Sequence, residues 1–185
     1  MLAIPNLFAI QTLTSTKAAS GLDKHISADR PPLNVLLQVN TSGEDAKSGV
    51  PPLNGSSEDG EAELTKLARY VVTECPRLHL HGLMTIGSLA ESLNADEKPN
   101  EDFERLVKTR DALQQVLEKE FPVQEGKSRW GEDGKLLLSM GMSSDFEAAL
   151  KEGSDIVRVG TSIFGSRPKK GESNVVEGVA DGMSH

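Results

Sequence analysis

Five short apolar runs alternate along the chain with longer segments of helical period, and this alternation limits the fold more than any other feature. Short runs that are almost continuously apolar are typical of strands buried on both faces of a parallel sheet. Strand, helix and strand in succession form the repeating unit of such sheets. We expect strands at residues 7–13, 33–40, 78–84, 136–140 and 156–159, and helices at 14–25, 61–75, 101–120 and after the capping-box spacing of 144–147, with a last turn at 161–166.

This alternation fits two α/β architectures, a doubly wound sheet and part of an eight-stranded (β/α)8 barrel. Five strands cannot close a barrel of this kind, so a barrel sequence with five strands lacks about three βα units. The first and last strands of an incomplete barrel have unpaired edges, which favour self-association or a partner that covers them.

The composition indicates one soluble domain. The chain has 185 residues, a formal net charge of −8 and one cysteine. The acidic balance leaves no continuous basic surface for a nucleic acid, and the apolar N-terminal run is neither a signal peptide nor a membrane span. Cys75 alone forms no internal disulfide, which is compatible with the cytoplasm or an organellar matrix such as that of mitochondria. We expect a domain at residues 1–167 and a disordered, polar tail at 168–185.

The turns after the last two predicted strands carry the clearest chemical signal. Ser143 follows Gly141 in the first turn, and Gly160 and Thr161 form the second. Small hydroxyl side chains, free backbone N–H groups at a helix start and a glycine that allows close approach together suit a phosphate. In (β/α)8 barrels, phosphate sites often use the loops after strands seven and eight. The structural alternative is that Ser143 and Ser144 only cap a helix.

Arg158 is a charged residue in an otherwise apolar strand. It alternates with Val157 and Val159, so its side chain points to the opposite face of the strand from theirs. There it would lie near the ring of a cofactor whose phosphate fills the two turns. The alternative is an ion pair with Asp145 or another acid.

The other candidate groups are better explained as structural. His79 and His81 share a face of the third predicted strand, but no third ligand has a metal-binding spacing, so we expect no metal site. Cys75 has no neighbouring histidine and is interpreted as an unreactive thiol. Lys47 follows the second strand and could reach the same end of the sheet, although a solvated loop lysine is the simpler interpretation. The charged, glycine-containing stretch at 123–135 is interpreted as a surface insertion.

Several blocks of the sequence resemble the pyridoxal phosphate homeostasis protein family. The similarity runs in order from about residue 5 to residue 167 and is interrupted by segments near 51–60, 88–100 and 124–134 that look like insertions. The blocks are LNVLLQVN at 33–40 with KSG at 47–49, HGLMTI at 81–86, LSMGMSSDFEAA at 138–149 and VRVGTSIFG at 157–165.

The resemblance implies an incomplete (β/α)8 barrel, similar to the amino-terminal domain of alanine racemase, with about the last five βα units present. It implies a protein that binds pyridoxal 5'-phosphate and serves vitamin B6 and amino-acid homeostasis without catalysing a reaction. Ser143, Gly160 and Thr161 would hold the phosphate, Met142 would line the pocket and Arg158 would face the pyridine nitrogen. The Schiff-base lysine of the family lies on the first strand, whereas this chain begins at what resembles the fourth, so we expect noncovalent binding.

Two other functions stay open at this stage. A pyridoxal phosphate-dependent racemase or decarboxylase is one, because the Arg158-Val159-Gly160 pattern resembles alanine racemase as well. Such enzymes carry a second, β-rich domain that 185 residues do not accommodate, and the sole tyrosine, Tyr70, falls on a predicted helix away from the strand ends. The other is a chain that binds no cofactor and acts through a partner covering its open edge.

Overall fold

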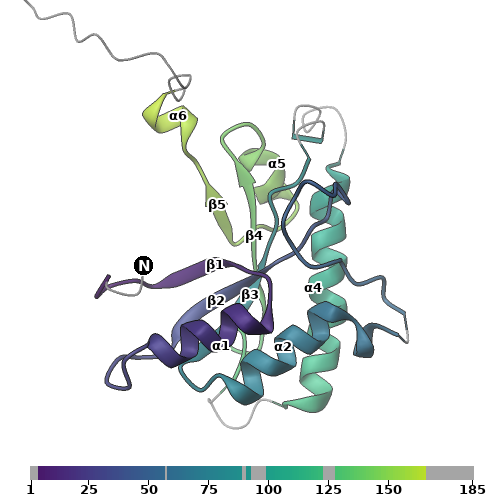
Figure 1. The fold of residues 1–185 in the computed structure, drawn as a ribbon. Coiled ribbons are helices and arrows are strands. Elements are labelled where there is room, and N and C mark those ends of the chain that lie inside the picture. Colours follow the sequence, from purple (N-terminus) through teal and green to yellow (C-terminus); the bar gives the residue numbers. More distant parts are fainter. Residues whose placement is uncertain (1–3, 57, 89–90, 93–98, 123–127, 166–185) are drawn as a thin grey trace, which may run out of the picture.

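All five strands form one sheet in the computed structural model, which describes residues 4–56, 58–88, 91–92, 99–122 and 128–165 (Figure 1). The spatial order is β1-β2-β3-β4-β5, the same as the order along the chain, and every neighbouring pair is parallel. A doubly wound sheet reverses its strand order at a switch point, and this sheet does not. The strands are β1 (Ala9–Leu13), β2 (Leu33–Gln38), β3 (Leu78–Met84), β4 (Leu137–Met142) and β5 (Ile156–Arg158).

Helices join the strands as the sequence predicts. The bounds of β3 and α4 agree with the prediction, and those of the other predicted elements differ by two residues or fewer at each end. The helices are α1 (Thr16–His25), α2 (Glu63–Glu74), α4 (Glu101–Glu120), α5 (Phe146–Lys151) and α6 (Thr161–Phe164), with the short 3-10 helix η1 (Asp59–Glu61) before α2.

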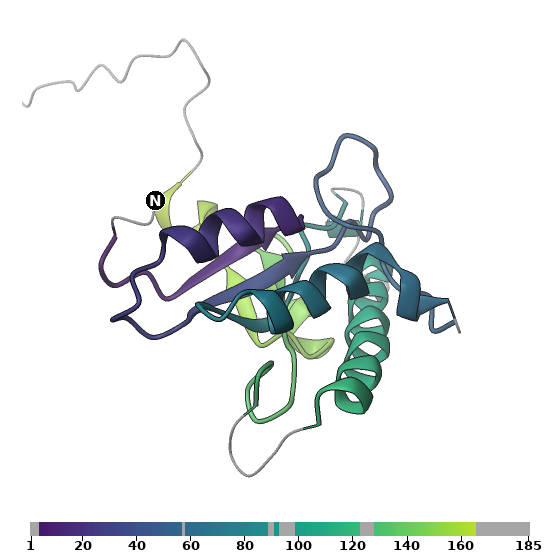
Figure 2. The ribbon, with the colours of Figure 1, turned by 60° about the horizontal axis from the view of Figure 1, so that its bottom comes forward.

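The main core lies between the sheet and the helices α1, α2 and α4; α1 and α2 run side by side, and α4 packs next to α2 in a different direction (Figures 1 and 2). In α2, Leu64, Leu67, Ala68 and Val71 recur at spacings of three and four residues and are all buried. This spacing places them on one side of the helix, where they pack toward the strands. In the described part of the chain, no strand pairs with the outer edge of β1 or of β5, which leaves the sheet open on both sides.

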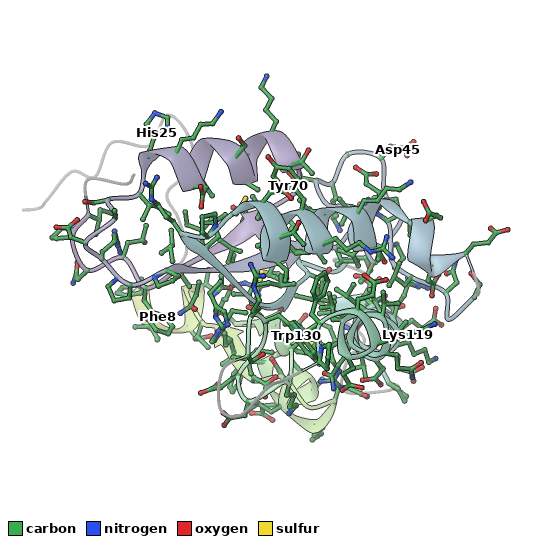
Figure 3. The ribbon with its side chains drawn as sticks, turned by 90° about the horizontal axis from the view of Figure 1, so that it is seen from below. Phe8, His25, Asp45, Tyr70, Lys119 and Trp130 are labelled. Carbon is green, nitrogen blue, oxygen red and sulfur yellow. The ribbon has the colours of Figure 1, made fainter. Side chains whose placement is uncertain are left out.

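The predicted surface insertion is wrong for its second half. Trp130 is 0% exposed, its indole N–H donates to the Phe121 carbonyl at 3.1 Å, and it forms a parallel bridge with Leu80 of β3 (Figure 3). The backbone N–H of Gly131 donates to the Leu80 carbonyl at 2.7 Å. Burial of this large aromatic ring outweighs the charged residues around it and holds the segment against the sheet. Residues 123–127 lie outside the described part.

The predicted capping box is also wrong. The helix α5 begins at Phe146, its cap residue is Asp145, and no side chain caps its first N–H groups. The carboxylate of Asp145 turns back into the preceding turn, where it accepts a hydrogen bond from the Met142 N–H. The predicted tail at 168–185 lies outside the described residues. No helix in the described part is long and apolar enough to cross a membrane.

Candidate functional site at the turns after β4 and β5

Just before the end of β4 lies a glycine, Gly141, that no other residue replaces without strain. Gly141 has a φ of 91°, and a Cβ at this position would lie 2.5 Å from the Cβ of Ala149 in α5. The glycine therefore permits both the left-handed backbone and the close packing of α5 on β4. This geometry presents Met142 and Ser143, both half-buried, at the carboxyl end of the strand.

The predicted phosphate residues lie together in the structure. The hydroxyl oxygen of Ser143 accepts hydrogen bonds from the backbone N–H of Gly160 at 2.9 Å and of Ser162 at 3.4 Å. Thr161 lies between these two donors, is exposed and is the first residue of α6. Apart from its two chain neighbours, no residue has an atom within 4 Å of the place of a Cβ on Gly160, so the space beside this backbone is open. The Gly160 N–H, which donates to the Ser143 hydroxyl, thus lies beside open space, and the exposed Thr161 follows it directly.

Arg158 has the partners on the opposite face that its position in the strand predicts. One terminal nitrogen donates to the Ser139 hydroxyl on β4 and the other to the Thr85 carbonyl after β3, each at 2.7 Å. The Ser139 hydroxyl in turn donates to the Gln11 side chain of β1 at 2.7 Å. In the described residues Arg158 forms no ion pair with Asp145 or another acid, so the alternative raised by the sequence is not observed. Burial lowers the pKa of Arg158 and the charge of Asp145 partly offsets this, but a guanidinium stays protonated.

Asp145 is a residue of this site whose role the sequence did not show. It is 4% exposed, and its carboxylate accepts from the Met142 N–H at 2.6 Å and from the Ser92 hydroxyl at 2.5 Å. The sequence suggested it only as an ion-pair partner of Arg158. Ser92 is 53 positions away in the sequence, and no local pattern connects the two residues.

Lys47 reaches the carboxyl end of the sheet and is not a solvated loop lysine. Its amine donates to the Gly87 carbonyl, just beyond β3, and pairs with the Glu44 carboxylate, both at 2.7 Å. The amine therefore lies at the same end of the sheet as Arg158 but is held by two oxygen atoms.

The remaining candidates occupy structural positions. The Nδ1 atom of His79 lies 3.1 Å from the Asn34 side-chain oxygen, and burial lowers the pKa of both His79 and His81. No group of three metal-ligating side chains occurs in the described residues. Cys75 is 2% exposed, and burial raises the pKa of its thiol to about 11, in agreement with an unreactive core thiol. Tyr70 lies on α2, away from the strand ends.

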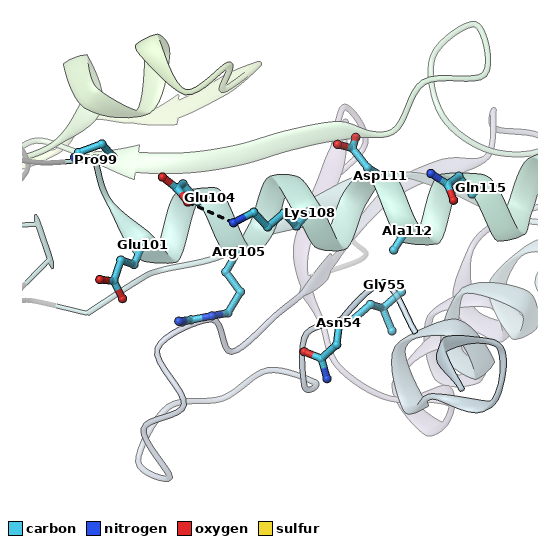
Figure 4. A pocket seen from close by; sticks show the side chains of 11 residues that line it. Asn54, Gly55, Pro99, Glu101, Glu104, Arg105, Lys108, Asp111, Ala112 and Gln115 are labelled. Atoms are coloured by element: carbon cyan, nitrogen blue, oxygen red, sulfur yellow. Dashed lines mark hydrogen bonds and ion pairs between the residues drawn. The ribbon is translucent and has the colours of Figure 1, made fainter. Parts of the chain in front are cut away.

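A separate groove of about 900 Å³ lies between α4 and the loop at 53–55 (Figure 4). Acids and bases mix along its wall, where Lys108 pairs with Glu104 at 3.2 Å. None of the predicted site residues lines it. The groove is therefore distinct from the turns after β4 and β5.

The model of the family "Alanine racemase, N-terminal domain" matches residues 2–168 of this chain. The chain belongs to this family. The predicted resemblance to pyridoxal phosphate homeostasis proteins is confirmed by relatives that carry that name. The one from Schizosaccharomyces pombe is 41% identical over 94% of this chain and 62% of its own length, and the human one is 36% identical over 90% of this chain and 53% of its own. The chain thus spans between about half and three fifths of these relatives.

Solved structures of similar fold confirm the barrel class. A protein of unknown function from Bifidobacterium adolescentis matches with a TM-score of 0.61 and 34% identity, over 87% of this chain and 54% of its own. A D-threonine aldolase from Filomicrobium marinum, a (β/α)8 barrel protein, matches with a TM-score of 0.59 and 14% identity, over 83% of this chain and 35% of its own. The second likeness concerns the fold alone. The five parallel strands correspond to an incomplete (β/α)8 barrel, as predicted.

Proposed function

We propose that this chain binds pyridoxal 5'-phosphate noncovalently at the turns after β4 and β5 and serves vitamin B6 and amino-acid homeostasis without catalysing a reaction. One observation carries the proposal. The N–H groups of Gly160 and Ser162 converge on the Ser143 hydroxyl beside open space. The names of the relatives from Schizosaccharomyces pombe and human support the same ligand and role.

The residues present fit a phosphorylated pyridine aldehyde. Backbone N–H groups and small hydroxyl side chains are the donors that bind phosphate at such turns, here those of Ser143, Gly160 and Thr161. Met142 would lie beside the bound ligand, and Arg158 would face its pyridine nitrogen. Bound pyridoxal phosphate supplies an aldehyde and a ring that accepts electrons, and a permanently charged guanidinium beside the ring nitrogen disfavours its protonation. This arrangement suits storage and delivery of the ligand better than catalysis.

Attachment to a lysine is not part of the proposed function. Lys47 is placed at the carboxyl end of the sheet, and its amine is already held by Glu44 and the Gly87 carbonyl. We assign binding to the domain at residues 1–167 and place the protein in the cytoplasm or the mitochondrial matrix, where Cys75 stays reduced.

The test is a titration of the purified chain with pyridoxal phosphate, followed by borohydride reduction and peptide mass spectrometry. We expect saturable binding that inorganic phosphate competes away, weaker binding of pyridoxal without its phosphate, and no single lysine modified at stoichiometric yield. Equal affinity for pyridoxal and pyridoxal phosphate would exclude the two turns as the phosphate site. A stoichiometric adduct on Lys47 would exclude noncovalent binding.

A further inference from the structure

The turn after β4 contains a buried carboxylate that the proposed ligand contacts leave without a role. Asp145 is at the amino end of α5, yet its side chain caps no N–H group of that helix. A buried negative charge next to an anion site repels the anion, and burying a carboxylate is costly in itself. The nearby charge of Arg158 offsets part of this cost, and the hydrogen bonds of the carboxylate show what else its position provides.

Asp145 is hydrogen-bonded to the turn through both its side chain and its backbone. Its Oδ1 atom accepts from the Met142 N–H at 2.6 Å, and its own backbone N–H donates to the Met142 carbonyl at 3.2 Å. Ser143 directly follows Met142, so these two bonds fix the backbone that carries the Ser143 hydroxyl. The Oδ2 atom accepts from the Ser92 hydroxyl at 2.5 Å, and Ser92 is itself buried. Each carboxylate oxygen is thus engaged by a donor from the protein.

We propose that Asp145 is a positioning residue for the anion site. Its carboxylate, which is hydrogen-bonded by Ser92, fixes the turn at 141–145. This turn places the Ser143 hydroxyl where it accepts from the N–H groups of Gly160 and Ser162. Asp145 acts through the turn and does not touch the ligand. The identity of the ligand rests on the proposed function, but the hold on the turn exists without any ligand.

Three variants separate the hydrogen bonds of Asp145 from its charge. Asp145→Ala removes both, and Ser92→Ala removes one hydrogen bond and is the milder change. Asp145→Asn removes the charge but keeps an oxygen for the Met142 N–H, and its amide can donate to the Ser92 hydroxyl. Glu147→Gln, which neutralises an exposed acid on α5, is the matched control.

Two measurements are made on each variant, with thermal unfolding to verify that it is folded. The first is amide hydrogen exchange at Met142, Gly160 and Ser162 in the ligand-free chain, measured by NMR. The second is the affinity for pyridoxal phosphate. For Asp145→Ala we expect exchange at these amides to rise and binding to weaken by about tenfold, the worth of about one hydrogen bond. Ser92→Ala gives a smaller change of the same kind, and Asp145→Asn and Glu147→Gln behave like the parent.

Two results would overturn the inference. One is unchanged exchange at the three amides in both Asp145→Ala and Ser92→Ala. The other is an Asp145→Asn variant as impaired as Asp145→Ala, because the charge and not the hydrogen bonds would then matter. If the parent chain binds no pyridoxal phosphate, the proposed function fails, whereas the exchange measurement still decides the role of Asp145.

Discussion

Replacing Gly141, Gly153 or Gly160 by alanine tests the backbone geometry around the candidate site. The three positions differ in backbone conformation and in the space available for an added methyl group, so the loss of stability should differ among them. Gly141 has a φ of 91° and a Cβ clash at 2.5 Å, Gly153 has a φ of 87° with open space, and Gly160 has a negative φ with open space. A left-handed alanine costs about 1–2 kcal/mol, and overpacking in a tight contact adds about 1–3 kcal/mol. Alanine also makes the unfolded chain less flexible, which offsets about 0.4–1 kcal/mol.

We therefore expect Gly141→Ala to lower the free energy of unfolding by about 2–4 kcal/mol and Gly153→Ala by about 1 kcal/mol. Gly160→Ala should change it by less than about 1 kcal/mol. Urea unfolding followed by circular dichroism measures all three. Gly160→Ala should nevertheless weaken pyridoxal phosphate binding, since its methyl group occupies the open space beside the N–H donors.

Replacing Ala149 by glycine in the Gly141→Ala background removes the colliding Cβ and provides an internal check. The double variant should regain part of the lost stability despite the helix cost of glycine, which is about 1 kcal/mol. Equal losses for Gly141→Ala and Gly153→Ala, with no recovery in the double variant, would show that the contact between the turn and α5 is not tight. The geometric account of the Ser143 position would then fail with it.

Three further predictions concern charge and burial. Arg158→Gln should lower the free energy of unfolding by about 1–3 kcal/mol in urea titrations, because the Ser139 hydroxyl and the Thr85 carbonyl lose a charged donor. The control Lys108→Gln breaks only an exposed ion pair with Glu104 and should change the free energy of unfolding by less than about 0.5 kcal/mol. Burial lowers the pKa of His79 and His81 in the folded state, so near pH 6.5 and below the unfolded chain binds more protons than the folded one, and the free energy of unfolding should fall as the pH drops through 6.5. Replacing both histidines by glutamine should flatten this pH dependence. An unchanged slope in that double variant would contradict the prediction. The thiol of Cys75, with its pKa raised to about 11, should resist iodoacetamide in the folded chain and react fully in urea, and fast alkylation of the folded chain would show that the core is open there.

The sequence predicts the succession of strands and helices along the chain because each element depends on a short-range pattern, whereas those patterns alone fit both a doubly wound sheet and a barrel. The almost continuous apolar run at 33–40 and the helical spacing in 101–120 each report their own structure within a few residues. The burial of the segment at 128–135 could not be predicted in this way. Its charges indicate a surface loop, whereas the buried ring of Trp130 holds the segment against the sheet. Capping at 144–147 fails for a related reason. The predicted box places Ser144 at the cap, whereas the cap residue is Asp145, whose carboxylate accepts from the Met142 N–H and the Ser92 hydroxyl instead of from the helix.

The candidate site also has a part that the local sequence predicts and a part that depends on distant residues. Ser143, Gly160 and Thr161 are recognisable because each lies in a turn whose sequence already carries the needed donors. The orientation of Arg158, by contrast, depends on the Thr85 carbonyl 73 positions away and on Ser139, which Gln11 holds from a distance of 128 positions. Only the parallel order of β1, β3, β4 and β5 brings these groups together. Gln11 on the edge strand β1 holds the Ser139 hydroxyl that accepts from Arg158, so β1 contributes to the orientation of the guanidinium although it does not contact Arg158 by a hydrogen bond itself.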